Sequence, residues 1–166
     1  RSVTAVAKHS SFTDSEEASV VLHNGSGTPE DPYLISGDTD FTDFVTNVNN
    51  GTAADKCFKL IVDVTAGATP ITTEYTGVFD GNGYTISGLG HALFNTVNGG
   101  VVKNVILDAV NISSGTNVGA IANKVTGTSS KVASVYNRGI LSGSVSGSGY
   151  VGSIVGQLGD DSNNDN

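Results

Sequence analysis

The side chains best suited to chemistry in this chain stand in the segment Asp80-Gly81-Asn82-Gly83. Carboxylate and amide oxygens in a glycine-rich loop are ligands that calcium accepts. An EF-hand loop, however, needs further acidic ligands and a closing Glu, and both are missing here. Asn-Gly is instead a strong signal for a tight turn or hairpin. The residues therefore favour a structural turn, and we assign no metal ligand to it.

The remaining residues that could bind metal or act as nucleophiles are isolated. His9, His23 and His91 have no partner at ligand spacing, and the chain contains no His-Glu-x-x-His segment. Cys57 is the single cysteine and lies among apolar residues, which predicts a buried, inert thiol. We therefore expect no cofactor, no metal and no catalytic residue in this chain.

Asp108 and Arg138 raise the question of a carbohydrate-active enzyme. Cleavage of a glycosidic bond normally uses two carboxylates that face each other across a cleft. These residues occupy equivalent positions of a sequence repeat, but they form one acid and one base. The pattern favours a solvent-exposed ion pair between neighbouring strands, and a carbohydrate-active enzyme is kept as the third reading.

Composition and charge narrow the class of protein. The 166 residues carry a net charge of −8 with only 8 Lys and Arg, which disfavours a nucleic-acid partner. No run of 18 apolar residues exists, so we expect no membrane insertion. The 22 glycines and an apolar content of 37% are typical of many short strands joined by turns.

A repeat in the second half of the chain predicts how those strands are arranged. Apolar residues recur at offsets of 30 and 33 positions, which indicates stacked supersecondary units. The aligned pairs are Val102 with Val132, Val105 with Val135, Val110 with Ile140, and Val118 with Val151. We expect the members of each pair to lie side by side in the folded protein.

One helix is predicted, at about 38–50. Phe41, Phe44, Val45 and Val48 form an apolar stripe at helical spacing. Asp38 or Thr39 can cap its first turn, and Asn50-Gly51 is a suitable stop. We expect this helix to cover the open N-terminal end of the stacked strands.

The chain divides into three segments. Residues 1–28 are expected to be peripheral, with short strands at 2–6 and 18–22. Residues 29–158 are expected to hold the strands and the helix. The polar segment 159–166 is expected to be a disordered tail or a severed linker.

Two glycine-rich segments carry a resemblance to a known family. The segment 149–157 resembles the GLUG motif, a G-x-V-G-G-L-V-G pattern. The segment 117–123, which contains Val118 and Gly119, looks like a degenerate copy of it. The segments 27–35 and 79–86 are similar to elements that precede such repeats. The motif residues are Gly149, Tyr150, Val151, Gly152, Ile154, Val155 and Gly156. Ser153 and Ala120 depart from the pattern, which has a second Gly at each of these places.

This resemblance implies a right-handed parallel β-helix from a large secreted or cell-surface bacterial protein. Such proteins include adhesins and the non-catalytic N-terminal regions of IgA-specific zinc metallopeptidases. With the repeat, it predicts a mostly β fold, namely a short right-handed parallel β-helix (β-solenoid) with an N-terminal capping helix.

The function expected from the resemblance is that of a non-catalytic, adhesin-like binding or spacer module. The alternative is a scaffold or exosite region of an IgA-type metallopeptidase. In either case the chain would continue into a larger polypeptide and could bind a host protein or a glycan, and the binding residues are not identified.

The repeat also leaves one conflict. If Val105 points into the core, simple alternation along a strand places Lys103 on the same face. We expect Lys103 to lie at a corner where the strand begins, with its ammonium group in solvent. Otherwise the inward set would be Val102, Asn104 and Ile106.

Overall fold

The computed structural model describes residues 24–114, 117–144 and 149–159. The short strands predicted at 2–6 and 18–22 and the tail from residue 160 lie outside these described residues. Within them the chain forms one helix and twelve strands, and every pairing between strands is parallel. Only strands and turns follow the helix, as the sequence predicts.

The elements follow one another in chain order. The first are β1 (Tyr33–Ile35), α1 (Asp38–Asn49), β2 (Cys57–Leu60), β3 (Val64–Thr65), β4 (Val78–Asp80) and β5 (Thr85–Ser87). The later ones are β6 (Phe94–Asn98), β7 (Val101–Asp108), β8 (Asn111–Ser114), β9 (Ala122–Thr126), β10 (Lys131–Asn137), β11 (Ile140–Ser144) and β12 (Val155–Leu158).

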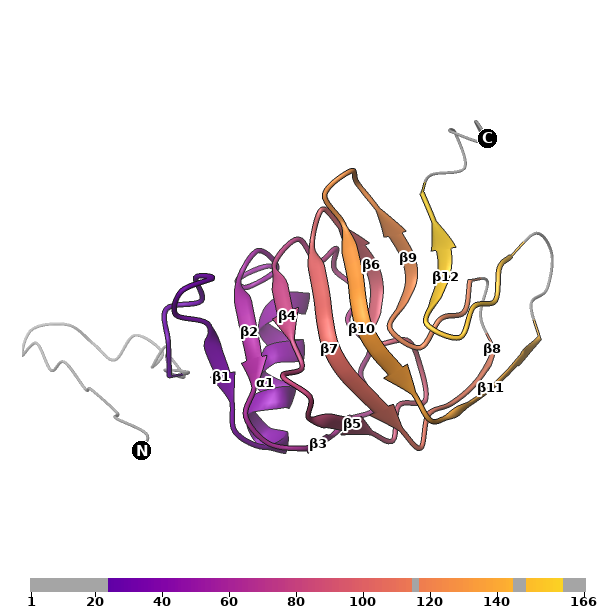
Figure 1. Ribbon diagram of the computed structural model, residues 1–166, viewed down its shortest axis with the longest axis horizontal. Coiled ribbons are helices and arrows are strands. Elements are labelled where there is room, and N and C mark those ends of the chain that lie inside the picture. The colour runs from indigo at the N-terminus through magenta and orange to yellow at the C-terminus, as the bar shows by residue number, and fades with distance from the viewer. Residues whose placement is uncertain (1–23, 115–116, 145–148, 160–166) are drawn as a thin grey trace, which may run out of the picture.

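These strands form three sheets (Figure 1). The largest has seven strands in the order β1-β2-β4-β7-β5-β3, with β10 paired to β7 beside this path. The other two sheets have the orders β11-β8 and β12-β9-β6.

The strand order corrects the predicted fold class. A short right-handed parallel β-helix with an N-terminal capping helix was expected to stack equivalent strands in chain order. In the main sheet neighbouring strands are instead out of sequence, because the long strand β7 pairs with β4 and β5 as well as with β10. The fold is mostly β, with parallel sheets and one short helix, and the main sheet has the crossover order familiar from α/β proteins.

Strand β7 pairs with three other strands, and a bend at Asn104 allows it to do so. Asn104 has a φ of 56°, in the left-handed region that Asn tolerates better than most residues. Val101 to Lys103 pair with β4, and Ile106 to Asp108 pair with β5. The bend also explains how Val105 can point into the core although Lys103, two residues earlier, does not. Val102, Val105 and Leu107 are buried, whereas Lys103 is part-exposed.

The predicted register is confirmed for three of the four pairs. Val132 lies beside Val102 and Val135 beside Val105 in the parallel pair of β10 and β7. Val118 and Val151 form an isolated parallel bridge. The fourth pair is wrong by one residue, because Ile140 lies beside Asn111 rather than Val110. The residue before Val110, Ala109, has a φ of 49° and turns the chain between β7 and β8, where the offset changes from 30 to 29.

The predicted helix is confirmed over Asp38–Asn49, and its stripe of Phe41, Phe44, Val45 and Val48 is buried. The predicted N-cap is wrong: Gly37 occupies that position without a side-chain cap. Asp40 binds back to Ser36 instead, accepting hydrogen bonds from its backbone nitrogen at 2.9 Å and its hydroxyl at 2.5 Å. At the other end Asn50 is the C-cap, and Gly51 follows with a φ of 76°.

The apolar interior changes in character along the sheets. Beside α1 it is aromatic, and the ring of Phe44 lies 4.6 Å from that of Phe58 and 5.1 Å from that of Phe79. Tyr75 stacks on Phe94 with ring centroids 4.8 Å apart. Figure 1 shows α1 toward this N-terminal side and β11 and β12 at the opposite side, with β10 near the middle of the view.

Candidate functional site

The segment Asp80-Gly81-Asn82-Gly83 forms the predicted tight turn. Asn82 and Gly83 have φ values of 52° and 80°, and the backbone nitrogen of Tyr84 donates to the Gly81 oxygen at 2.8 Å. This is the arrangement of a type I′ turn, which requires positive φ at both central residues. The turn does not make a hairpin, because β4 and β5 on either side of it both pair with β7.

The carboxylate of Asp80 is used within this turn and on the neighbouring strand. One of its oxygens accepts hydrogen bonds from the Asn82 backbone nitrogen at 2.8 Å and the Asn104 side-chain amide at 2.9 Å. The other lies 3.3 Å from the Lys103 ammonium. Partial burial acts to raise the pKa of Asp80, but these partners outweigh it and hold the pKa below its ordinary value.

The two glycine-rich segments of the resemblance lie against each other. The Val118 backbone nitrogen donates to the Tyr150 oxygen at 2.8 Å, and the Gly152 nitrogen donates to the Val118 oxygen at 2.9 Å. A Cβ on Gly156 would lie 2.7 Å from the Asn123 oxygen. This close backbone approach explains why a glycine is needed there.

The other motif residues surround this contact. Gly119 faces Val155 and Gly156 so closely that a Cβ would collide with them. Tyr150 is exposed, Ile154 and Val155 are part-buried against the core, and Gly149 precedes them in the chain.

Asn117 ties the two segments together through its side chain. Its amide oxygen accepts from the Tyr150 backbone nitrogen at 3.1 Å, and its amide nitrogen donates to the Gln157 side chain at 2.7 Å. Asn117 is the first residue of the degenerate copy at 117–123, but the glycine pattern predicted no role for its side chain. Its place one position before the first motif valine was the available signal.

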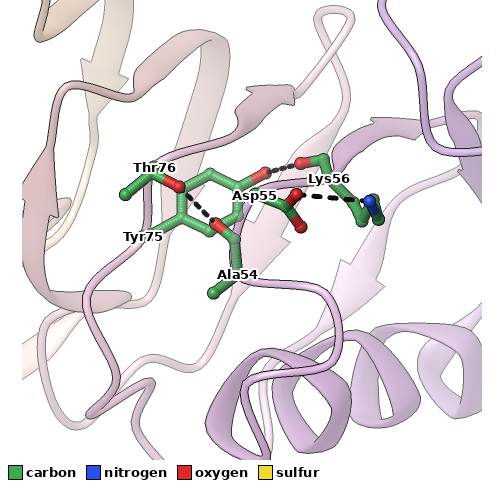
Figure 2. Close-up of polar contacts among 5 residues, drawn as sticks. All are labelled: Ala54, Asp55, Lys56, Tyr75 and Thr76. Atoms are coloured by element: carbon green, nitrogen blue, oxygen red, sulfur yellow. Dashed lines mark hydrogen bonds and ion pairs between the residues drawn. The ribbon is translucent and has the colours of Figure 1, made fainter.

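A second polar cluster lies at the aromatic interior (Figure 2). The hydroxyl of Tyr75 donates to the Lys56 carbonyl at 2.8 Å, and the Thr76 hydroxyl donates to the Ala54 carbonyl at 3.3 Å. Asp55 and Lys56 form an exposed ion pair at 3.2 Å. Burial, with smaller effects of Cys57 and Asp55, raises the pKa of Tyr75 well above its ordinary value, so the phenol remains a hydrogen-bond donor.

The cysteine and the histidines that lack a ligand partner in the sequence also form no metal site in the described part of the structure. Cys57 is buried, as predicted. The ring nitrogens of His91 face the carbonyls of Ala92 at 2.8 Å and Gly67 at 3.3 Å. His9 and His23 lie outside the described residues. Among the described residues no three His, Cys, Asp or Glu side chains gather where they could hold a metal ion.

The predicted ion pair between Asp108 and Arg138 is not formed in the described part of the chain, where the ion pairs are Lys56–Asp55 and Lys103–Asp80. The Arg138 backbone nitrogen instead donates to the Leu107 oxygen at 2.9 Å. Sequence reasoning missed the Lys103 pair because it used an offset of 30. Strands β4 and β7 pair at an offset of 23, with Asp80 beside Lys103.

No helix in the described residues is long and apolar enough to cross a membrane. The described residues form paired strands, tight turns and hydrogen bonds between the side chains of neighbouring segments. The carboxylate of Asp80 and the amides of Asn104 and Asn117 join neighbouring segments of the chain.

Comparison with known proteins places these features in a family. The chain is 30% identical to halomucin of Haloquadratum walsbyi (strain DSM 16790 / HBSQ001) over an alignment covering 84% of this chain and 2% of halomucin. No solved structure matches the chain significantly. Residues 39–139 match the model of the M26 IgA1-specific metallo-endopeptidase N-terminal region. Since this match spans more than half of the sequence, the chain belongs to the family of the M26 IgA1-specific metallo-endopeptidase N-terminal region.

Proposed function

We propose that this chain is a non-catalytic binding and scaffold module of a larger secreted or cell-surface protein. The observation that carries the proposal is the family match, which names an N-terminal region of a metallo-endopeptidase. The matched residues 39–139 include nearly all of α1 and the strands from β2 to β10. The similarity of the chain to 2% of halomucin supports a place within a very long polypeptide.

The roles of the polar side chains support this reading. Asp80, Asn104 and Asn117 each bind another strand or turn, so they stabilise the fold through contacts that a reacting group would have to give up. A carbohydrate-active enzyme would need a second carboxylate facing the first across a cleft. Asp80 has a lysine and an asparagine as its side-chain partners.

Two versions of the module differ in what it binds. As an exosite of an IgA1-specific peptidase it would hold the immunoglobulin while a separate domain cuts it, and the family match favours this version. As an adhesin-like module it would bind a host protein or a glycan. The resemblance of residues 149–157 to the GLUG motif supports that second version.

Incubating the purified chain with IgA1, and separately with a panel of neutral and acidic glycans, tests the proposal. Binding is measured on a sensor surface and cleavage by mass spectrometry. Binding of IgA1 without cleavage supports the exosite, and binding of a glycan without turnover supports the adhesin-like module. Turnover that Asp80→Asn or Asp108→Asn abolishes would show that the chain is an enzyme.

A further inference from the structure

Three segments of the chain match the acceptor pattern for N-linked glycans, which is Asn-x-Ser/Thr with any residue except proline in the middle. They are Asn24-Gly25-Ser26, Asn50-Gly51-Thr52 and Asn111-Ile112-Ser113. A chain rich in asparagine, serine and threonine contains such triplets by chance. The pattern therefore gains weight only if the fold treats these three asparagines differently from the others.

The asparagines of the described residues do fall into two groups. The three in the pattern make no side-chain hydrogen bond to the described part of the chain. Outside the pattern, eight asparagines use their side-chain amides in hydrogen bonds, namely Asn49, Asn82, Asn95, Asn98, Asn104, Asn117, Asn123 and Asn137. Asn47 is the remaining one, and it is only part-exposed. The fold thus leaves free the amides that the pattern marks.

The asparagines of the pattern are also exposed. Asn50 is the C-cap of α1, and the space beside it is open, since a Cβ added to Gly51 would meet no atom within 4 Å. Asn111 begins β8 between Val110 and Ile112, which are both buried. Alternation along the chain therefore directs the Asn111 side chain outward.

Neighbouring asparagines show what a glycan would disturb elsewhere. The Asn49 amide nitrogen donates to the Pro70 carbonyl at 3.0 Å, and its amide oxygen accepts from the Thr72 backbone nitrogen at 2.8 Å. A sugar on this nitrogen would have to displace the segment that it holds. On Asn50, the next residue, a sugar displaces no described partner.

We propose that Asn24, Asn50 and Asn111 are acceptors of N-linked glycans. The donor is an oligosaccharide joined to a lipid through pyrophosphate. The asparagine amide nitrogen forms a bond to the anomeric carbon of the first sugar, the bond from that carbon to the pyrophosphate breaks, and the nitrogen loses one proton. The inference rests on the secreted or cell-surface location in the proposed function, and it adds a covalent modification to the binding role.

Secretion of the full chain from eukaryotic cells, which attach glycans to this pattern, tests the proposal. Peptide N-glycosidase converts each glycosylated Asn to Asp, and mass spectrometry of the peptides locates the change. The variant Ile106→Thr extends the pattern to Asn104, whose amide donates to Asp80 at 2.9 Å. Ile106→Val is the matched control without the pattern.

We expect glycans on Asn50 and Asn111 of the secreted chain, and none on Asn104 of the secreted Ile106→Thr variant. A secreted chain without a glycan on Asn50 and Asn111 would overturn the proposal. Equal occupancy of Asn104 and Asn50 in folded protein would overturn it as well, because occupancy would then not follow the free amides.

Melting temperatures of the chain made without glycans provide a second readout. Asn50→Gln and Asn111→Gln should leave the melting temperature unchanged, because these amides hold no described partner. Asn49→Gln should lower it by about 2–4 °C, the effect of about one lost hydrogen bond in a chain of this size. A loss for Asn50→Gln as large as that for Asn49→Gln would assign its amide to the fold and contradict the proposal.

The tests with IgA1 and with glycans as ligands use the chain made without attached glycans, so the two sets of results are independent. Occupied Asn50 and Asn111 on a chain that binds neither ligand would leave the acceptor sites in place and remove the binding function proposed above. Binding of a ligand by a chain whose acceptors stay empty would remove only the acceptor sites.

Discussion

Around α1 the apolar interior is fully buried, and we call this region the covered end. Apolar side chains of β10 and β12 are instead part-exposed or exposed, and we call these two strands the open end. The covered end is built from aromatic rings, with Phe44 in contact with Phe58, Phe79 and Phe94. The open end is built from Val, Ile and Leu, including part-buried Val132, Val135, Ile154 and Val155. Among the described residues the same kind of parallel pairing thus holds a fully buried aromatic interior in one region and a part-exposed aliphatic one in the other.

The difference indicates which region contributes more to the stability of the fold. Aromatic side chains bury more area than aliphatic ones, and all the Phe residues among those described lie at the covered end. Free energy of folding should therefore concentrate there.

The largest expected effect compares two valines at one register position. Val105→Asp places a carboxylate in the core without a partner, which costs several kcal/mol out of a total of about 5–15 kcal/mol, so we expect unfolded or insoluble protein. Val135→Asp, beside it on β10, is part-exposed and should leave the chain folded. Solubility and far-UV circular dichroism check both, and equal loss would mean that β10 is buried in solution.

The next largest effect is expected from removing the ring of Phe44, at the centre of the aromatic cluster. Phe44→Ala should lower the free energy of unfolding by about 3–5 kcal/mol, because it removes a fully buried ring that touches several others. Leu158→Ala at the open end should change it by less than about 0.5 kcal/mol. Urea denaturation measures both, and a large loss for Leu158→Ala would contradict the exposure of β12.

Removal of one hydroxyl gives a smaller effect. Tyr75→Phe deletes the hydrogen bond to the Lys56 carbonyl while keeping the stacking on Phe94, and should cost about 1 kcal/mol. The matched control is Tyr136→Phe on β10, which is 69% exposed and should be neutral. The two melting temperatures make the comparison, and a shift confined to Tyr136→Phe would reverse the assignment.

The smallest effect is a pH dependence. The pKa of Asp80 is below its ordinary value of 3.8 in the folded chain, so the native state holds this proton less strongly than the unfolded state. The contribution of Asp80 is complete above that ordinary value and is lost as the pH falls through the folded pKa.

Asp80→Asn should flatten the acid limb of the curve of melting temperature against pH. The control Asp108→Asn alters an exposed carboxylate on the same strand system and should leave that limb in place. Identical acid limbs for Asp80→Asn and the unaltered chain would show that the ties from Lys103 and Asn104 are not formed in solution.

The turn at Asn82-Gly83 and the ion pair of Lys103 with Asp80 show which features the sequence could predict and which it could not. The tight turn at Asn82-Gly83 was predictable because the positive φ of both residues is a local property. The ion pair was not, because it depends on an offset of 23 between β4 and β7 that differs from the offset of 30 read in the later repeat. A pattern in one half of the chain did not hold in the other.

What the sequence by itself determined is what near neighbours decide: helix α1 from its apolar stripe, the turn at Asn82-Gly83, the burial of Cys57 and the side-by-side valines of β7 and β10. Only the tertiary structure decided which strands share a sheet and in which order they lie. The physical reason is the bend at Asn104, which lets β7 pair with β4 and β5 together. A bend at one residue leaves little trace in the apolar pattern, yet it decides which strands one long strand can pair with.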